Sequence, residues 1–224
     1  MKKYGENKHY SEKRPYCRFD IINYLIEKNN YISYLEIGVR DPKACFNRII
    51  AEHKDGVDPQ PLSLEINYPM MSAEFFDLIR GHDEIKYDII FVDGAHIYET
   101  AKDDVLNSFL HLTTNGTIVM HDCNPPSMWH QRPAEAYDGS GEWNGTAWKA
   151  YVELRCLRKD LSMSVIDTDY GVGVIQFGKQ KVWKTDDFKK CIEYEYLDNN
   201  RQRLLNLISP EEFENIYTNR RYVK

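Results

Sequence analysis

The chain alternates short apolar runs with amphipathic segments from about residue 19 to residue 178. Apolar side chains recur every three or four residues in 19–28 and in 98–112, which predicts helices there. Residues 31–38, 87–94 and 116–122 are richer in apolar side chains, as strands covered on both faces are. Because strands that alternate with helices are typical of a parallel sheet covered on both faces, we predict an α/β fold.

Four weaker patterns fill the region after the first predicted strand. Residues 41–53 begin with a potential cap, Asp41, and a proline, so they predict a helix. A short second strand is expected over 55–59, and a third strand somewhere within 60–71. A helix over 72–80 begins at Ser72.

The second half of the chain continues the alternation. Asn115-Gly116 is typical of a helix end, so we expect the helix that includes Tyr98 to stop there. Residues 146–159 predict another helix. Residues 163–178 contain two β-rich runs separated by a turn, which predicts an antiparallel hairpin at a sheet edge.

The length and composition indicate one domain. The chain has 224 residues, 42% of them hydrophobic, which is enough to fill one core. We predict a single domain over 1–224, with a flexible N-terminal arm (1–17), a lid-like loop (124–145) and a C-terminal helical extension (179–224).

Charge and cysteine content narrow the functional classes. The net charge is −6 and no basic stripe is present, which argues against nucleic acid as a partner. No apolar stretch is long enough to predict a membrane span, and the expected location is cytoplasmic. The five cysteines show no metal-binding spacing and are expected to be unlinked thiols. The aromatic C-terminal tail is a candidate interface for a homo-oligomer.

Polar side chains end almost every predicted strand. Ligands of open α/β sheets bind beyond the carboxyl ends of the strands, so these residues are candidates for a site. They are Glu36, Gly38, Arg40 and Asp41 at the end of the first strand, Asp58 at the end of the second, Asp93, Gly94 and His96 at the end of 87–94, and His121, Asp122 and Asn124 at the end of 116–122.

The first turn favours a cationic nucleoside over a dinucleotide. GVRDPK retains one glycine of the dinucleotide-binding pattern, and Asp41 would repel a pyrophosphate at the start of a helix. Asp58 follows Gly38 at the spacing of a carboxylate that binds ribose hydroxyls. S-adenosylmethionine combines a ribose with a sulfonium and an ammonium group, so acids such as Glu36 and Asp41 suit it better than they suit NAD.

Several of these segments together resemble the class I S-adenosylmethionine-dependent methyltransferases, over roughly residues 17–215. The similarity is greatest to the sugar and small-molecule O-methyltransferases found with bacterial glycan genes. FVDGAH and HDCNPP are its most specific parts. The segments are YLEIGV, GVDP, MSAEFF, YDIIFVDGAHIYETAKDDV, NGTIVMHDCNPP, WNGTAWKA and DTDYGVGVI.

The resemblance implies a fold, a cofactor and residue roles. The fold is a Rossmann-like seven-stranded, mostly parallel sheet with helices on both faces and a C-terminal antiparallel hairpin. S-adenosylmethionine would be bound by Glu36 and Gly38 at its methionine end, by Asp58 at its ribose, by Ser72 near its adenine, and by Asp93. Some relatives, including macrolide-sugar O-methyltransferases, also bind a divalent metal such as Mg²⁺. Asp93, His121 and Asp122 occupy the matching positions, although His121 stands where an acid is usual.

The expected chemistry is methyl transfer to a hydroxyl of a sugar, a glycan or a similar small molecule. The enzyme must align the acceptor with the methyl group and remove the proton of the hydroxyl. His96, His121 and Asp122 are the candidate catalytic residues, with the histidines as bases or a metal ion as the alternative.

Structural roles compete with each of these functional ones. His96 could cap a helix, His121 could bond to neighbouring backbone, and Asp103 and Asp104 are expected on a solvated helix face. Trp129, Tyr137 and Trp143 of the loop suit either a sugar ring or a lid that packs on its own domain. An NAD-dependent sugar-nucleotide oxidoreductase and a cofactor-binding module without catalysis are the alternative functions.

Overall fold

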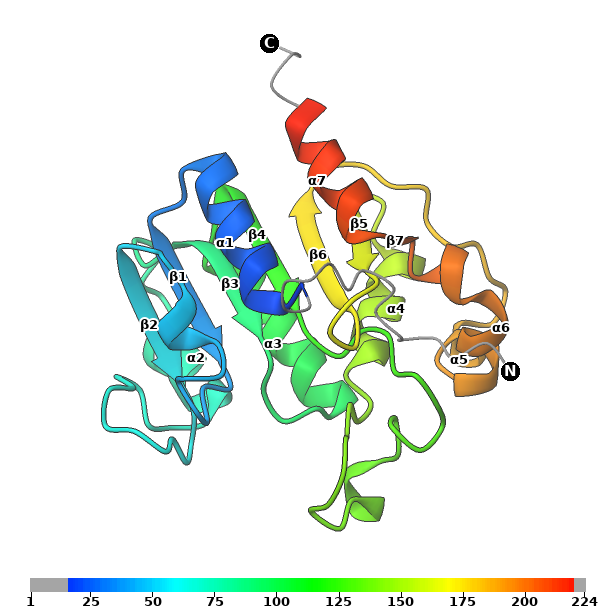
Figure 1. Ribbon diagram of the computed structural model, residues 1–224, viewed down its shortest axis with the longest axis horizontal. Coiled ribbons are helices and arrows are strands. Elements are labelled where there is room, and N and C mark those ends of the chain that lie inside the picture. Colours follow the sequence, from blue (N-terminus) through cyan, green and yellow to red (C-terminus); the bar gives the residue numbers. More distant parts are fainter. Residues whose placement is uncertain (1–15, 220–224) are drawn as a thin grey trace.

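The computed structural model describes residues 16–219, so most of the predicted N-terminal arm and the last five residues lie outside the described part. Seven strands form one sheet in the order β2-β1-β3-β4-β6-β5-β7 (Figure 1). The strands are β1 (Ser33–Ile37), β2 (His53–Val57), β3 (Tyr87–Val92), β4 (Leu112–Met120), β5 (Leu161–Ile166), β6 (Val172–Phe177) and β7 (Leu207–Ile208).

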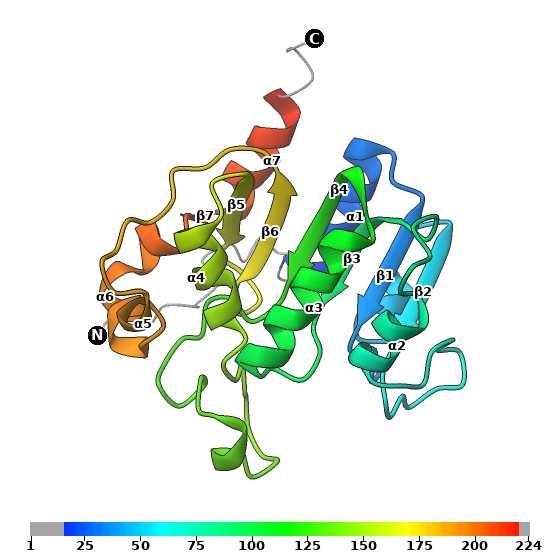
Figure 2. The same ribbon diagram turned by 180° about the vertical axis from the view of Figure 1, so that it is seen from behind.

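Helices cover both faces of this sheet. The helices are α1 (Arg18–Asn29), α2 (Ser72–Leu78), α3 (Tyr98–Leu110), α4 (Trp148–Leu157), α5 (Phe188–Cys191), α6 (Tyr194–Leu204) and α7 (Pro210–Asn219), with 3-10 turns at Phe46–Arg48 and Ala134–Ala136. Helices α1 and α7 lie in front of the sheet in Figure 1, and α3 and α4 lie in front in the opposite view of Figure 2. None of the helices within residues 16–219 combines the length and apolarity needed to span a bilayer.

The alternation of side chains along the strands divides the core into two layers. Tyr34, Ile89 and Phe91 pack with α1 and α7, whereas Leu35 and Ile90 pack with α2, α3 and α4. Successive residues of a strand point to opposite faces, so a strand between two helical layers must be apolar at nearly every position. This explains the nearly continuous apolar runs of β3 and β4.

Strand directions confirm the predicted Rossmann-like fold. Strands β1, β2, β3 and β4 are mutually parallel, and β6 is antiparallel to both β4 and β5. The C-terminal hairpin of β5 and β6 was therefore predicted correctly. It is not at the sheet edge, however, because β7 pairs with β5 in parallel beyond it.

Two predictions about strands were wrong in detail. Residues 60–71 contribute only an isolated bridge between Val57 and Tyr68, so the seventh strand comes from the C-terminal tail. Asn115-Gly116 lies inside β4 and does not end a helix. The preceding helix already ends at Leu110, where the N–H of His111 bonds to the carbonyl of Ser108.

The helix predicted over 41–53 is replaced by turns and one 3-10 turn. Neighbouring elements form hydrogen bonds with backbone groups that would otherwise pair within a helix. Lys54 Nζ donates to the carbonyl oxygens of Phe46 and Ile49 at 3.0 and 3.2 Å. Asn23 of α1 donates to the carbonyl of Arg48 and accepts from the N–H of Ile50. Tertiary hydrogen bonds thus outweigh the local helical pattern.

Three further predictions concern the loop over 124–145, the cysteines and Trp148. Residues 124–145 form an irregular loop that extends beyond the carboxyl ends of the central strands, at the bottom of Figure 1. All five cysteines are free thiols. Trp148 in α4 is fully buried, which fits its interpretation as a core residue.

Candidate active site

Three parallel strands end side by side. Ile37 of β1 pairs with Val57 of β2 and with Val92 of β3, so Gly38, Asp58 and Asp93 follow at neighbouring positions. A Cβ atom on Gly38 would lie 2.1 Å from the carbonyl oxygen of Asp93, and Gly38 has a positive φ of 99°. The turn after β1 therefore passes against the end of β3 only because residue 38 is glycine.

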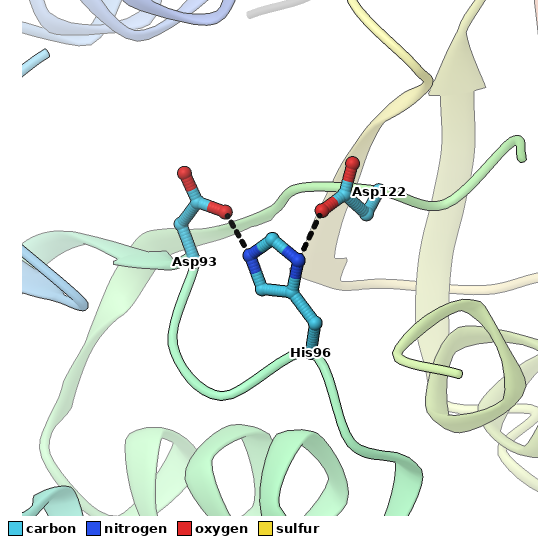
Figure 3. Close-up of side chains that lie close together, drawn as sticks. All are labelled: Asp93, His96 and Asp122. Atoms are coloured by element: carbon cyan, nitrogen blue, oxygen red, sulfur yellow. Dashed lines mark ion pairs between the residues drawn. The ribbon is translucent and has the colours of Figure 1, made fainter. Parts of the chain in front are cut away.

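Asp93, His96 and Asp122 converge beyond the ends of β3 and β4 (Figure 3). The imidazole of His96 lies between the carboxylates, with Nε2 3.3 Å from Asp93 Oδ1 and Nδ1 3.1 Å from Asp122 Oδ2. His96 and Asp122 both have positive φ, of 54° and 59°, which turns their side chains back toward the site. Such strain in residues other than glycine is typical of functional sites.

His121 lies beneath this group and contacts both acids. Its Nδ1 is 3.3 Å from Asp93 Oδ1 and 3.3 Å from Asp122 Oδ1. Its Nε2 lies 2.7 Å from Nη1 of Arg18 and 3.5 Å from Asp169 Oδ1. His121 is buried, so the acceptor would meet His96 more readily than His121.

Two charged residues of the site were missed by the sequence analysis. Arg18 begins α1 and binds Asp169 in the β5–β6 turn, with Nη1 3.1 Å from Asp169 Oδ1. Its Nε lies 3.8 Å from Asp93 Oδ2. Asp169 lies within the quoted segment DTDYGVGVI, so its position in a turn was visible, but the spacing gives no sign that it pairs with residue 18.

The acids control the protonation of His96. Burial alone lowers the pKa of this histidine, but a hydrogen bond with Asp93 and the charge of Asp122 outweigh burial and raise the pKa to about 9. In the chain alone His96 therefore carries a proton at neutral pH. It can act as a base only after that proton has left.

The same three residues have the composition of a metal site. Asp93, His96 and Asp122 each offer a ligand atom, and these atoms lie within 4.8 Å of one another. Asp122 is buried, and its Oδ2 lies 3.1 Å from His96 Nδ1 but makes no hydrogen bond within the described residues. Buried carboxylate oxygens usually have partners, so the residues fit a divalent cation. His121 was predicted as the third ligand, but His96 completes the cluster of ligand atoms.

The predicted cofactor residues lie along the other strand ends. Glu36 is buried and accepts a hydrogen bond from the hydroxyl of Tyr34, and burial raises its pKa to about 8. Asp58 accepts a hydrogen bond from the N–H of Gln60 at 2.7 Å. Ser72 at the start of α2 bonds to Asp104 of α3.

Asp104 was expected on a solvated helix face, but this prediction was wrong. It is buried, and burial raises its pKa to about 6. It lines a small pocket together with Asp93, His96 and Asp122. The neighbouring acid in the pattern, Asp103, is exposed. Two consecutive acids on one helix cannot both face solvent when the helix packs on a sheet, but composition does not show which one is buried.

Comparison with known proteins identifies the central part of the chain. Residues 34–123 match a protein family described as a methyltransferase domain. The match covers less than half of the chain. Among proteins of curated function, none matches the sequence.

One solved structure shares the fold, and others are similar at lower TM-scores. A cofactor-bound protein from MTB is 12% identical, with a TM-score of 0.50 over 71% of this chain and 79% of that one. An O-methyltransferase from Bacillus cereus in complex with SAH is 12% identical, with a TM-score of 0.47 over 69% and 77%. The MycE methyltransferase of the mycinamycin pathway, in complex with Mg, SAH and mycinamycin VI, is 16% identical, with a TM-score of 0.45 over 71% of this chain and 50% of that one.

The residues that match the methyltransferase family contain most of the predicted site. Residues 34–123 include Glu36, Gly38, Asp58, Asp93, His96, His121 and Asp122. The predicted methyltransferase activity is thus confirmed at the level of the domain, with S-adenosylmethionine as its predicted methyl donor. Arg18, Asp169 and the lid-like loop come from outside the matched residues.

Proposed function

We propose that this methyltransferase transfers a methyl group from S-adenosylmethionine to a hydroxyl of a sugar, a glycan or a similar small molecule. The observation that carries the proposal is the convergence of Asp93, His96 and Asp122 beyond the ends of β3 and β4. These groups can bind a cation or take a proton from an alcohol. A methyltransferase for hydroxyl acceptors needs one of these two functions.

Methyl transfer is a single displacement in this proposal. The acceptor oxygen forms a bond to the methyl carbon while the carbon–sulfur bond breaks, and the sulfonium becomes a neutral thioether. The hydroxyl proton passes to a base. His96 is the more accessible of the two predicted histidines, so we assign it this role, with Asp93 and Asp122 orienting its ring.

In the alternative role of these residues, a divalent cation such as Mg²⁺ would be held by Asp93, Asp122 and His96, and it would lower the pKa of an acceptor hydroxyl in place of a base. Within the site, His121 orients Asp93 and Asp122 through Nδ1. Arg18 balances the negative charge by pairing with Asp169 and approaching Asp93.

S-adenosylmethionine is assigned to the ends of β1 and β2. Gly38 lets the turn after β1 pass close to Asp93, and Asp58 can accept hydrogen bonds from ribose hydroxyls. Glu36 is suited to the ammonium group, because a bound cation would favour its ionised form. Ser72, at the start of α2, is assigned to the adenine side.

The first experiment is calorimetry with the purified protein. We expect S-adenosylmethionine to bind and NAD not to bind. Binding of NAD alone would contradict the proposal and favour the oxidoreductase that the strand pattern also allowed. The acceptor is then sought with methyl-labelled S-adenosylmethionine and a panel of nucleotide sugars and glycans, with and without a chelator.

Histidine variants test the roles within the site. His96→Ala should lower turnover about 100-fold, the usual worth of a general base, with little change in affinity for S-adenosylmethionine. His82→Ala is a matched control because His82 is exposed and its ring bonds to nearby Glu84, away from the site. Equal turnover of the two variants would reject His96 as the base.

A further inference from the structure

A four-residue segment at the end of the lid-like loop contacts His96 and Asp122. This strap, residues 143–146 (Trp-Asn-Gly-Thr), precedes α4 and lies on the turn between β3 and α3. The N–H of Thr146 donates to the carbonyl of His96 at 2.8 Å, and Thr146 Oγ1 accepts from the N–H of Tyr98 at 2.9 Å. The strap is therefore fixed to the backbone of His96 and of Tyr98, where the turn leads into α3.

Gly145 lets the strap approach that turn closely. It has a φ of 59°, and a Cβ atom there would lie 2.1 Å from the carbonyl oxygen of His96. Any larger residue would push the strap away. The glycine of WNGT is thus required by contact with His96.

Trp143 contacts the imidazole of His96 in two ways. The rings stack, with centroids 5.3 Å apart and planes 25° apart. The carbonyl oxygen of Trp143 accepts a hydrogen bond from His96 Nδ1 at 3.2 Å. Together these contacts set the plane of the imidazole and leave Nε2 toward Asp93.

Trp143 is itself held by the rest of the loop. Its ring stacks on Tyr137, with centroids 4.4 Å apart and planes 8° apart, and its Nε1 donates to the carbonyl of Arg132 at 2.7 Å. The guanidinium of Arg132 lies 3.8 Å from the Trp129 ring centroid and 5.1 Å from that of Tyr137. A continuous stack thus runs from the outer part of the loop to His96.

Asn144 holds the second carboxylate of the site. Its side-chain amide donates to Asp122 Oδ1, and both residues are buried. Trp143 therefore contacts His96, and the next residue, Asn144, contacts Asp122. His96 Nδ1 and Asp122 Oδ2 are themselves 3.1 Å apart.

We propose that Trp143 and Asn144 are positioning residues that hold His96 and Asp122 in their relative geometry for methyl transfer. This inference rests on the proposed function of the same site. The strap acts on the reacting groups through two contacts and does not itself touch the transferred methyl group. Loss of either contact lets the imidazole or the carboxylate leave its position. A displacement of about 1 Å can lower the rate about 100-fold.

The test follows His96 by NMR in the full-length protein with ¹³C,¹⁵N-labelled histidine, with its signals assigned from their absence in His96→Gln. Stacking on an indole shifts the imidazole protons upfield. Trp143→Leu should abolish this shift, and Trp143→Phe should retain most of it. Asn144→Ala should cause a smaller change, because it frees the carboxylate beside Nδ1.

Trp183→Leu is the matched control for loss of a tryptophan. Trp183 is also partly buried and its Nε1 also donates a hydrogen bond, to Tyr196 at 3.1 Å, but it lies in the C-terminal extension. We expect it to leave the His96 signals unchanged. Unchanged His96 signals in Trp143→Leu, or equal changes in Trp183→Leu, would overturn the proposal.

The acceptor assay gives the second readout. Turnover should fall about 10- to 100-fold in Trp143→Leu, with the KM for S-adenosylmethionine unchanged and partial rescue in Trp143→Phe. An equal loss in the leucine and phenylalanine variants would contradict a role in stacking. If methyl transfer itself fails, the NMR comparison still decides whether the strap positions His96, so the two proposals fail separately.

Discussion

At the scale of single residues, Gly38 tests how tightly β1 and β3 meet at the site. Gly38→Ala should lower the free energy of unfolding by about 3 kcal/mol, because it adds a clash with the Asp93 carbonyl to the strain of a positive φ. Urea unfolding measures this. Gly81→Ala is the control: Gly81 has a φ of 82°, but a Cβ atom there would meet no other atom within 4 Å, so only the strain remains.

A loss in Gly81→Ala as large as that in Gly38→Ala would mean that strain alone decides the cost. The close approach of the two strand ends would then contribute little to stability.

Glu36 gives a pH dependence with a defined sign. Its pKa is raised from 4.5 to about 8, chiefly by burial, so the folded state binds a proton that the unfolded state releases above pH 4.5. This contribution favours folding at low pH and is lost as pH rises toward 8 and beyond. Glu36→Gln, which cannot ionise, should therefore gain melting temperature relative to the wild type between pH 5 and pH 8.5. The exposed Glu65→Gln should not show this trend.

The placement of residues at strand ends was predictable from the sequence. Asp93, His96 and Asp122 each follow an apolar run within a few residues, so their convergence was predictable from the parallel sheet. Arg18 and Asp169 are separated by 151 positions and meet only through the packing of α1 on the β5–β6 turn. No spacing along the chain encodes that pair.

At the scale of elements, Asp88 joins the starts of three strands. Its Oδ2 accepts hydrogen bonds from the N–H groups of Ile32 and Ser33 at 3.0 and 3.2 Å, and its Oδ1 accepts from Thr113 Oγ1 at 3.1 Å. These bonds hold the pKa of Asp88 below its usual range, although burial opposes them. They link β3 to the segment entering β1 and to β4.

Asp88→Ala should lower the free energy of unfolding by about 1–3 kcal/mol, because it leaves these donors without their acceptor. Asp88 lies at the amino end of β3, away from the site, so affinity for S-adenosylmethionine should not change. Calorimetric unfolding and binding measure the two quantities. A loss of affinity without a loss of stability would contradict this structural role.

The elements that were predicted wrongly show where local pattern loses to tertiary bonding. In 41–53 the burial of Cys45, Phe46 and Ile49 does follow a helical spacing, so the pattern predicted which side chains are inside. It did not predict the backbone, because Lys54 and Asn23 bind its carbonyl and amide groups. In β3 and β4 the apolar runs were predicted as strands, and the backbone groups pair within the sheet.

At the scale of the whole molecule, the C-terminal extension completes the sheet and reaches the site. Helix α6 lies between the hairpin region and β7, and β7 supplies the strand that 60–71 does not. The strand count was predictable from the resemblance, but the source of the last strand was not. A two-residue strand is too short for any alternation to reveal it.

Arg201 of α6 connects this extension to the loop that leaves Asp122. Its buried guanidinium donates to the side chain of Asn124 and to the carbonyl of Pro125 at 2.9 Å, and it also contacts Tyr194 and Asp198. Asn124 in turn donates to Asp167 at 3.0 Å. The start of the lid-like loop is therefore held by the guanidinium of Arg201, which comes from α6.

Arg201→Leu should lower the free energy of unfolding by about 3–5 kcal/mol, because it leaves buried acceptors unpaired in the middle of the fold. Asp198→Asn breaks only the contact with a half-exposed carboxylate, so its cost should stay below about 1 kcal/mol. Urea unfolding compares the two variants. If Arg201 acts through the loop after Asp122, Arg201→Leu should also shift the His96 signals while Asp198→Asn leaves them in place. Loss of stability with unchanged His96 signals would restrict Arg201 to holding the extension on the domain.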